Sequence, residues 1–151
     1  MLAAGIGMTP MVAMLDGLDF ARTRGKQTYP VDVVCVQSSR SAGDIFDRAR
    51  LEKLAVKSQD PKQRGPAWAN ASSRIAWTLI GAQAPPAQSP PGFWHEGRVN
   101  GSFLDQLVPD VAERVCYICS PQGYMDEAIE MVHKRGVPLP KIYTESFEPH
   151  A

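Results

Sequence analysis

The order of strand-like and helix-like segments is the feature that most constrains this chain. Short runs of β-branched and other apolar residues alternate with amphipathic stretches of helical period. This alternation is typical of a parallel sheet with helices on both faces, whose buried strands read as nearly continuous apolar runs. We therefore expect an α/β fold, a doubly wound parallel β-sheet of about five strands with a truncated first strand. The strands are expected at residues 1–4, 31–36, 74–80, 115–119 and 141–144.

Helices are expected between these strands. Thr9 is predicted to cap the first helix, Pro10 suits its first turn, and Gly25 suits its end. Gly136 is predicted as the glycine that follows the last helix. The four helices are expected at 10–24, 44–57, 101–107 and 122–135, and surface loops at the proline-containing segments 58–73 and 83–92.

The first expected strand is unusually short. Residues 1–4 are all that precede the first glycine loop, although a typical strand has about 5–6 residues. The first strand of a doubly wound sheet is usually central, so its shortness needs an explanation. A truncated protein, a domain excised from a longer chain and a shortened gene model each explain it.

Composition and charge narrow the functional class. The 151 residues suit one domain, and 44% of them are apolar, enough for a packed core. The formal net charge is zero, so the basic surface of a nucleic-acid-binding protein is not expected. No apolar run is long enough for a membrane span, and no charged region precedes the short apolar start. We therefore expect neither a membrane span nor a signal peptide.

The three cysteines do not indicate a disulfide framework or a metal site. Cys116 and Cys119 lie three apart in an expected strand, where such side chains point to opposite faces, so they are not expected to share a metal or a disulfide. The three histidines are scattered without ligand spacing, so no metal is expected. Unpaired cysteines favour a cytoplasmic or mitochondrial location.

Two glycines precede the first helix. Gly5 and Gly7, followed by Thr9 and Pro10, place a flexible loop before a helix start, whose amides and positive dipole end suit a pyrophosphate. A G-x-G by itself is weak evidence, and an ordinary tight turn between strand and helix explains it equally well.

A second turn of this kind follows the expected strand 115–119. Cys119, Ser120 and Pro121 lead from this strand into the last helix. Ligands of open α/β sheets bind beyond the carboxyl ends of the strands, so the two turns would flank one crevice if they share an edge. A buried, unreactive side chain is the alternative interpretation of Cys119.

Together these motifs resemble the nicotinamide-dinucleotide-binding domain of the ferredoxin–NADP reductase superfamily, which includes cytochrome b5 reductases, flavohaemoglobin reductase domains and oxygenase reductases. That domain has, in order, a G-G-x-G-[IM]-[TS]-P-[ML] loop, an S-R-type turn, a C-G-P-x-x-[MF] turn and a closing E-x-F. The chain offers residues 4–11, 39–40, 119–125 and 145–147 in the same order, over essentially its whole length. Residues 95–99 also look like the H-x-G-R stretch of the flavohaemoglobin-like branch.

The resemblance implies a role for each motif. The first loop would hold the pyrophosphate of NAD(P)H, and the 39–40 turn would meet the adenosine ribose and any 2′-phosphate. Cys119 is the catalytic candidate beside the nicotinamide, and Phe147 would lie toward the flavin. The predicted cofactor-binding residues are Gly5, Ile6, Gly7, Met8, Thr9, Pro10, Ser39, Arg40, Cys119, Ser120, Pro121, Met125 and Phe147.

Individual residues within the motifs refine this interpretation. Arg40 would favour NADPH because a guanidinium donates to a phosphate in a planar fork, although a solvated loop arginine is the alternative. Gln37 stands at the end of the expected second strand, where an acidic residue would bind a ribose diol. Ser120 replaces the family's usual glycine, and its Cβ would crowd the nicotinamide or the pyrophosphate. The R-x-Y-[ST] motif of the family's flavin barrel is absent from the sequence.

The resemblance implies that residues 1–151 are the NAD(P)-binding domain of a flavin-dependent oxidoreductase. NAD(P)H would give a hydride to FAD in a missing or separate flavin-binding domain, for onward transfer to an electron acceptor, and the isolated chain would turn over nothing. Such a reaction needs no general base, in agreement with the lack of a paired-carboxylate or Ser/His/Asp pattern. The alternatives are an interaction module that has lost cofactor binding, a non-redox nucleotide binder, and a fragment without independent function.

Overall fold

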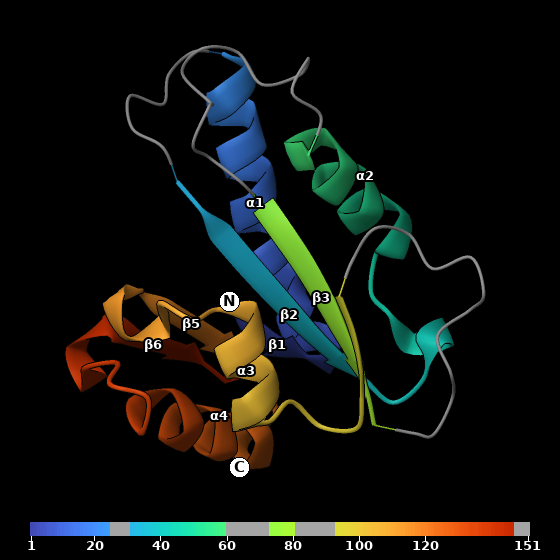
Figure 1. The fold of residues 1–151 in the computed structure, drawn as a ribbon. Helices are drawn as coiled ribbons and strands as arrows, with labels where there is room; N and C mark the ends of the chain where they lie inside the picture. The colour runs from blue at the N-terminus through green and yellow to red at the C-terminus, as the bar shows by residue number, and fades with distance from the viewer. Residues whose placement is uncertain (25–30, 60–72, 81–92, 147–151) are drawn as a thin grey trace.

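A six-stranded parallel sheet organises the computed structural model, which describes residues 1–24, 31–59, 73–80 and 93–146 (Figure 1). The strand order is β4-β3-β2-β1-β5-β6, and every neighbouring pair is parallel. The predicted doubly wound α/β fold is thereby confirmed. The strands are β1 (Leu2–Ala4), β2 (Val33–Ser39), β3 (Ser73–Leu79), β4 (Phe93–Glu96), β5 (Cys116–Cys119) and β6 (Ile142–Glu145).

The chain reverses its direction of travel across the sheet beside β1. From β1 it steps outward through β2, β3 and β4, and then returns to place β5 and β6 on the other side of β1. Two helices that leave neighbouring strands in opposite directions open a crevice between them. The carboxyl ends of β1 and β5 therefore mark the place where this fold most readily binds a ligand.

The sheet has one strand more than the sequence predicted. β4 pairs with β3 along the sheet edge, from Ala76 opposite Phe93 to Leu79 opposite Glu96. It is four residues long and carries His95 and Glu96, so it lacks the apolar run by which the other strands were predicted. The ring of His95 stacks on Phe103, with centroids 4.5 Å apart, and this packing holds the strand in place.

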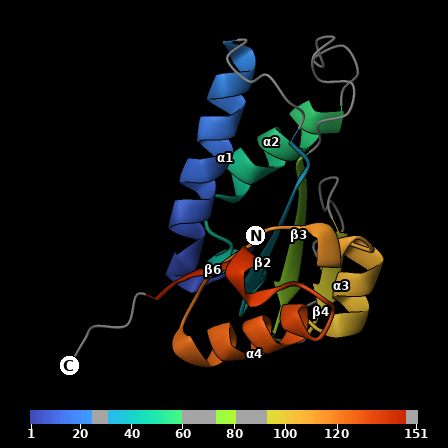
Figure 2. The same ribbon diagram turned by 90° about the vertical axis from the view of Figure 1, so that its left-hand side faces the viewer.

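Two helices cover each face of the sheet. In Figure 2 the sheet separates α1 and α2 from α3. One core lies between the sheet and the first pair of helices, with Leu15, Leu51 and Trp77 buried in it, and the other lies beneath α3 and α4. The helices are α1 (Met8–Thr23), α2 (Arg48–Gln59), α3 (Gly101–Leu107) and α4 (Gln122–His133).

Two predictions about helix starts are wrong. α1 begins at Met8, directly after a 3-10 turn at Gly5–Gly7, and the hydroxyl of Thr9 donates to the carbonyl of Ile6 at 2.8 Å instead of capping the helix. α2 begins later than expected because a separate 3-10 turn occupies Ala42–Asp44. The predicted Gly25 and most of the two predicted loops lie outside the described residues.

The opposite placement of Cys116 and Cys119 is confirmed. Cys116 packs in the core beneath α3 and α4, whereas Cys119 packs with Cys35 in the core beneath α1 and α2. All three thiols are buried and free. The strand geometry therefore prevents the C-x-x-C from holding a metal or closing a disulfide.

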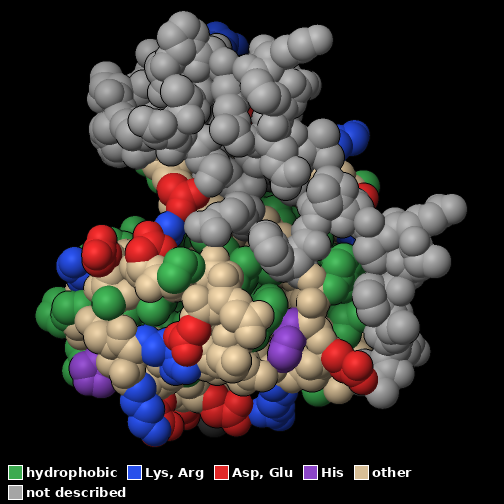
Figure 3. All heavy atoms as spheres, viewed as in Figure 1, with side chains coloured by type: hydrophobic (Ala, Val, Ile, Leu, Met, Phe, Trp, Pro, Cys, Tyr) green, Lys and Arg blue, Asp and Glu red, His purple; other side chains and the backbone are tan. Residues whose placement is uncertain are grey.

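The outer surface of the second helical layer is charged. α4 buries Met125, Ala128 and Val132 and turns its charged residues to solvent, where side chains of both signs gather along the lower margin of Figure 3. Gly136 follows this helix with a φ of 91°, as its predicted role requires. Among the described helices, none combines the length and the apolar character that crossing a membrane demands.

Replacing Ile118 tests the placement of β5 in the sheet. Ile118 is 1% exposed, so Ile118→Ala is expected to lower the free energy of unfolding by about 3 kcal/mol, through lost burial and the cavity left behind. Val115→Ala is the matched control, because Val115 is 49% exposed and its replacement should cost less than about 1 kcal/mol. Urea unfolding measures both, and equal losses would contradict this placement.

Candidate functional site

The two predicted turns leave the same edge of the sheet. In the parallel register Ala3 lies opposite Cys119, and Ala4 lies opposite Ser38. The chain therefore leaves β1, β2 and β5 at one level, the carboxyl edge, where ligands of this fold class bind. The turns at 5–10 and 119–123 therefore share one edge of the sheet, which the sequence alone could not decide.

The backbones of the two turns touch at Gly7. A Cβ added to Gly7 would lie 1.9 Å from the carbonyl oxygen of Cys119 and 2.9 Å from the amide nitrogen of Ser120. No side chain fits there, so glycine is required for close approach. Gly5 is required for a different reason, because its φ of +57° is left-handed backbone.

The helices that follow these turns begin without acidic side chains. The N-cap of α4 is Pro121, which offers no side-chain hydrogen bond, and neither α1 nor α4 has an acidic residue in its first turn. The first amides of a helix seek an acceptor, and the helix dipole favours a negative one. Two helix starts without acidic residues at one edge of the sheet suit a negatively charged ligand group.

The predicted site residues divide into exposed and buried groups. Gly5, Ile6, Thr9, Arg40 and Pro121 are exposed along the carboxyl edge. The side chains of Met8 and Met125 instead belong to the two cores, so they reach a ligand only through their backbone. Pro10 is half-buried, and Phe147 lies outside the described residues.

The thiol of Cys119, the catalytic candidate, is turned into the core. Burial raises its pKa, so at neutral pH it is a thiol and not a thiolate nucleophile. Its carbonyl, not its sulfur, makes the contact with Gly7. The structure therefore gives Cys119 a packing and positioning role at the turn.

Ser120 faces the protein as well. Its side chain is 1% exposed, and its hydroxyl has no hydrogen-bond partner among the described residues. The Ser120 side chain is therefore packed inside the protein instead of projecting from the turn.

A buried chain of hydroxyls escaped the sequence analysis. Ser38 lies 2.6 Å from the hydroxyl of Thr78 and 2.9 Å from that of Tyr124, so it links the carboxyl ends of β2 and β3 to the first turn of α4. Burial raises the pKa of Tyr124 to about 12, although the hydrogen bond with Ser38 lowers it in part. Polar residues near the ends of apolar strands were the available signal. The register of β2 and β3 pairs Ser38 with Thr78, and the packing of α4 on the sheet adds Tyr124.

The 39–40 turn has one buried and one exposed residue. Ser39 is buried and its hydroxyl points to the carbonyl of Asp44 at 3.5 Å, whereas Arg40 is exposed and, within the described part of the chain, pairs with no carboxylate. Gln37 does not end the strand as predicted, because β2 continues to Ser39 and Gln37 is fully buried. Arg40 is thus the residue of this turn that reaches solvent at the crevice.

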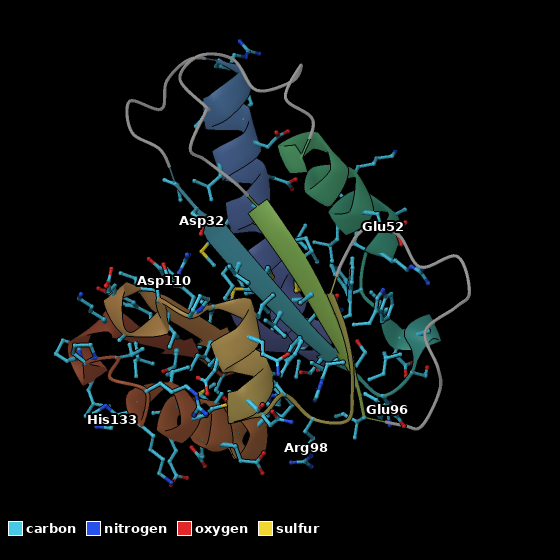
Figure 4. The ribbon with its side chains drawn as sticks, viewed as in Figure 1. Asp32, Glu52, Glu96, Arg98, Asp110 and His133 are labelled. Carbon is cyan, nitrogen blue, oxygen red and sulfur yellow. The ribbon has the colours of Figure 1, made fainter. Side chains whose placement is uncertain are left out.

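A second arginine on the same edge is already engaged. Arg98 follows β4 and projects at the lower edge of Figure 4, where its guanidinium pairs with Glu127 of α4 at 2.9 Å. Both side chains are largely exposed, so this pair contributes little to stability. Arg98 nevertheless gives a natural control for Arg40.

The sequence relatives are reductase subunits. No family model matches the chain. It is 27% identical over 148 residues to the glycine betaine monooxygenase reductase subunit of Pseudomonas aeruginosa, covering 98% of this chain and 34% of that protein. It is 26% identical over 146 residues to the stachydrine N-demethylase reductase subunit of Rhizobium meliloti, covering 97% and 35%. The chain thus spans about a third of the length of these relatives.

Solved structures establish the fold. The cytochrome P450 reductase GcoB of Amycolatopsis superimposes with a TM-score of 0.65 at 18% identity, covering 98% of this chain and 37% of that one. The chain therefore shares the fold of the matching part of that reductase. The flavohaem-like FAD/NAD-binding domain of the Vibrio cholerae nitric oxide dioxygenase agrees, with a TM-score of 0.63 at 20% identity over 98% of this chain and 50% of that one. The resemblance to this superfamily's nucleotide domain is confirmed by the reductase relatives and by the fold.

Replacing Gly7 tests the contact between the two turns. Gly7→Ala is expected to lower the free energy of unfolding by more than about 2 kcal/mol, because its Cβ would clash with the Cys119 backbone. Gly17→Ala in α1 is the matched control: its Cβ meets nothing within 4 Å, so the change should be neutral or stabilise by up to about 1 kcal/mol. Thermal unfolding compares the two. A Gly7 variant as stable as the wild type would rule out the close contact.

The hydroxyl chain makes a pH-dependent prediction. The pKa of Tyr124 is raised to about 12 from an ordinary value of about 10. The contribution of the neutral Tyr124 side chain to the free energy of unfolding is therefore complete below about pH 10 and is lost as the pH rises to about 12. Phenolate absorbance of the folded protein should show a late ionisation that Tyr124→Phe removes. Tyr117 is exposed, so Tyr117→Phe should leave the late ionisation intact. Loss of the late ionisation in Tyr117→Phe would show that it does not belong to Tyr124.

Proposed function

We propose that this chain binds NAD(P)H across the carboxyl ends of β1 and β5 and is the nucleotide-binding part of a flavin-dependent reductase. The observation that carries the proposal is the backbone contact of Gly7 with Cys119 and Ser120, which brings the starts of α1 and α4 together at the carboxyl edge. The reductase relatives and the shared fold support the same class of chemistry, electron transfer from NAD(P)H through a flavin.

The chain's own residues bind and orient the dinucleotide. The 5–7 turn and the first amides of α1 and α4 receive the pyrophosphate, and Arg40 lies where the ribose end of the ligand would extend. The 119–121 turn forms the wall at the nicotinamide end, with Pro121 exposed. When bound, NAD(P)H supplies a hydride, and FAD held by a separate or preceding domain accepts it.

No residue of this crevice is needed as a general base. The Cys119 thiol is buried, and its pKa is raised by burial. Hydride transfer requires the donor and acceptor rings to be positioned and water to be excluded, which the backbone turns can do. The proposal therefore assigns residues 1–151 a binding and orienting role. We expect the isolated chain to bind NAD(P)H without turning it over.

Calorimetric titration of the folded chain with NADPH and NADH tests the proposal. Saturable heat with at least one of them is expected. Absence of heat with both, from a sample whose folding is shown by circular dichroism, would remove the proposed function. Bleaching of a related reductase's isolated flavin domain by NADPH, dependent on this chain, would separate a redox role from plain nucleotide binding.

The role of Arg40 predicts a difference between the two nucleotides. A charge-assisted hydrogen bond to a 2′-phosphate is worth about 1.5–3 kcal/mol, so Arg40→Ser should weaken NADPH binding by about tenfold or more. NADH binding should change by less than about twofold, because that ligand lacks the 2′-phosphate. Arg98→Ser is the matched control on the same edge and should leave both affinities unchanged. Equal effects of the two substitutions would show that Arg40 does not read the phosphate.

A further inference from the structure

Tyr124 joins the first turn of α4 to the sheet through its hydroxyl. The Tyr124 oxygen lies 2.9 Å from the hydroxyl oxygen of Ser38, although the two residues are 86 positions apart in the chain. Ser38 lies opposite Ala4 in the parallel ladder, and Ala4 directly precedes the first glycine turn. Tyr124 therefore ties the start of α4 to the level at which β1 ends.

The Ser38 hydroxyl is held from a second side. It lies 2.6 Å from the hydroxyl of Thr78, its ladder partner on β3, and both side chains are buried. A hydroxyl has one hydrogen, so Ser38 donates to one neighbour and accepts from the other. Loss of the Ser38 hydroxyl therefore breaks two hydrogen bonds, one of which is the link to Tyr124.

The amino end of α4 is thus tied to the sheet at two places. On the β1 side, the backbone of Gly7 approaches the peptide of Cys119 and Ser120. On the β2 side, the hydrogen bond between Tyr124 and Ser38 holds the helix one turn further along the chain. The first contact fixes the turn before α4 and the second fixes the helix itself. Together they set the direction in which the first amides of α4 point.

Gly123 lies between these two ties. It is exposed, and a Cβ at this position would meet nothing within 4 Å. The next two amides, of Tyr124 and Met125, donate to the carbonyl of Pro121, whereas the described residues offer the Gly123 amide no acceptor. Glycine has wide backbone freedom, so the orientation of this amide depends on the neighbours that hold it.

We propose that Tyr124 is a positioning residue of the dinucleotide site: its hydrogen bond with Ser38 holds the first turn of α4 so that the Gly123 amide faces the pyrophosphate. This inference rests on the proposed function. Tyr124 acts without touching the ligand, and it acts on both nucleotides alike, because NADPH and NADH share the pyrophosphate. Its role therefore differs from that of Arg40, which is expected to act only on the nucleotide with a 2′-phosphate.

Removing the hydroxyl tests this role. Tyr124→Phe keeps the ring, which packs against the core beneath α3 and α4. We expect about threefold to tenfold weaker binding of both NADPH and NADH by calorimetry, with the ratio of the two affinities unchanged. Ser38→Ala breaks the same bond from the sheet side and should weaken both to a similar extent. The double variant should bind no more weakly than Ser38→Ala, because the two side chains act through one hydrogen bond.

Tyr117→Phe is the matched control. It removes the hydroxyl of an exposed tyrosine on β5, and it should leave both affinities unchanged. Circular dichroism and thermal unfolding verify that each variant is folded at the temperature of the titration.

A spectroscopic measurement separates positioning from a general loss of stability. In the wild type, saturation with the tighter-binding nucleotide should move the amide resonance of Gly123 in a proton–nitrogen correlation spectrum, because the amide gains a charged acceptor. In folded Tyr124→Phe at saturation the displacement should be smaller. A loss of stability alone would leave the displacement of the saturated, folded protein unchanged.

The possible results distinguish this inference from the proposed function. If the folded wild type binds neither nucleotide, both fail. If the wild type binds but Tyr124→Phe binds both nucleotides equally well, only the positioning role is overturned. Weaker binding of NADPH alone would overturn it too, since the pyrophosphate is common to both ligands. An unchanged response of the Gly123 resonance in Tyr124→Phe would have the same consequence.

Discussion

The approach of Gly7 to the Cys119–Ser120 peptide is the contact on which the carboxyl edge of this protein depends. It joins a turn near the start of the chain to one more than a hundred residues later, and it leaves no room for a side chain. Because the contact is between backbones, it fixes the two helix starts relative to each other and not merely the two side chains. The proposed diphosphate site depends on that arrangement.

The two ends of the sheet have opposite chemistry because all six strands are parallel. At the carboxyl edge the chain turns into helices, so helix amino ends, glycines and the exposed Arg40 gather there. At the amino edge, by contrast, apolar side chains line a cavity, and Arg114 pairs with Asp32 and Asp110. The carboxyl edge is therefore the end of the sheet that agrees with the proposed anionic ligand.

The crevice favours binding over side-chain catalysis. Its thiol and its serine hydroxyl are both buried, and the Ser38–Thr78–Tyr124 hydroxyls brace α4 against the sheet from below. A rigid contact between α4 and the sheet agrees with the proposed reaction, in which two cofactor rings must be held at a fixed distance and orientation. The reductase subunits that the chain resembles are about three times as long as the chain itself.

The sequence by itself determined the parallel α/β class, five of the six strands, the four helices, the opposite faces of Cys116 and Cys119 and the two turns of the crevice. These features depend on local backbone preferences and on the spacing of apolar residues along a helix or strand, both of which can be read from a short segment. The tertiary structure alone decided the β4 pairing, the burial of Gln37 and Ser120 and the hydroxyl chain. Each of these depends on register between strands distant in the chain, and register is set by packing of the whole sheet, which no local pattern encodes.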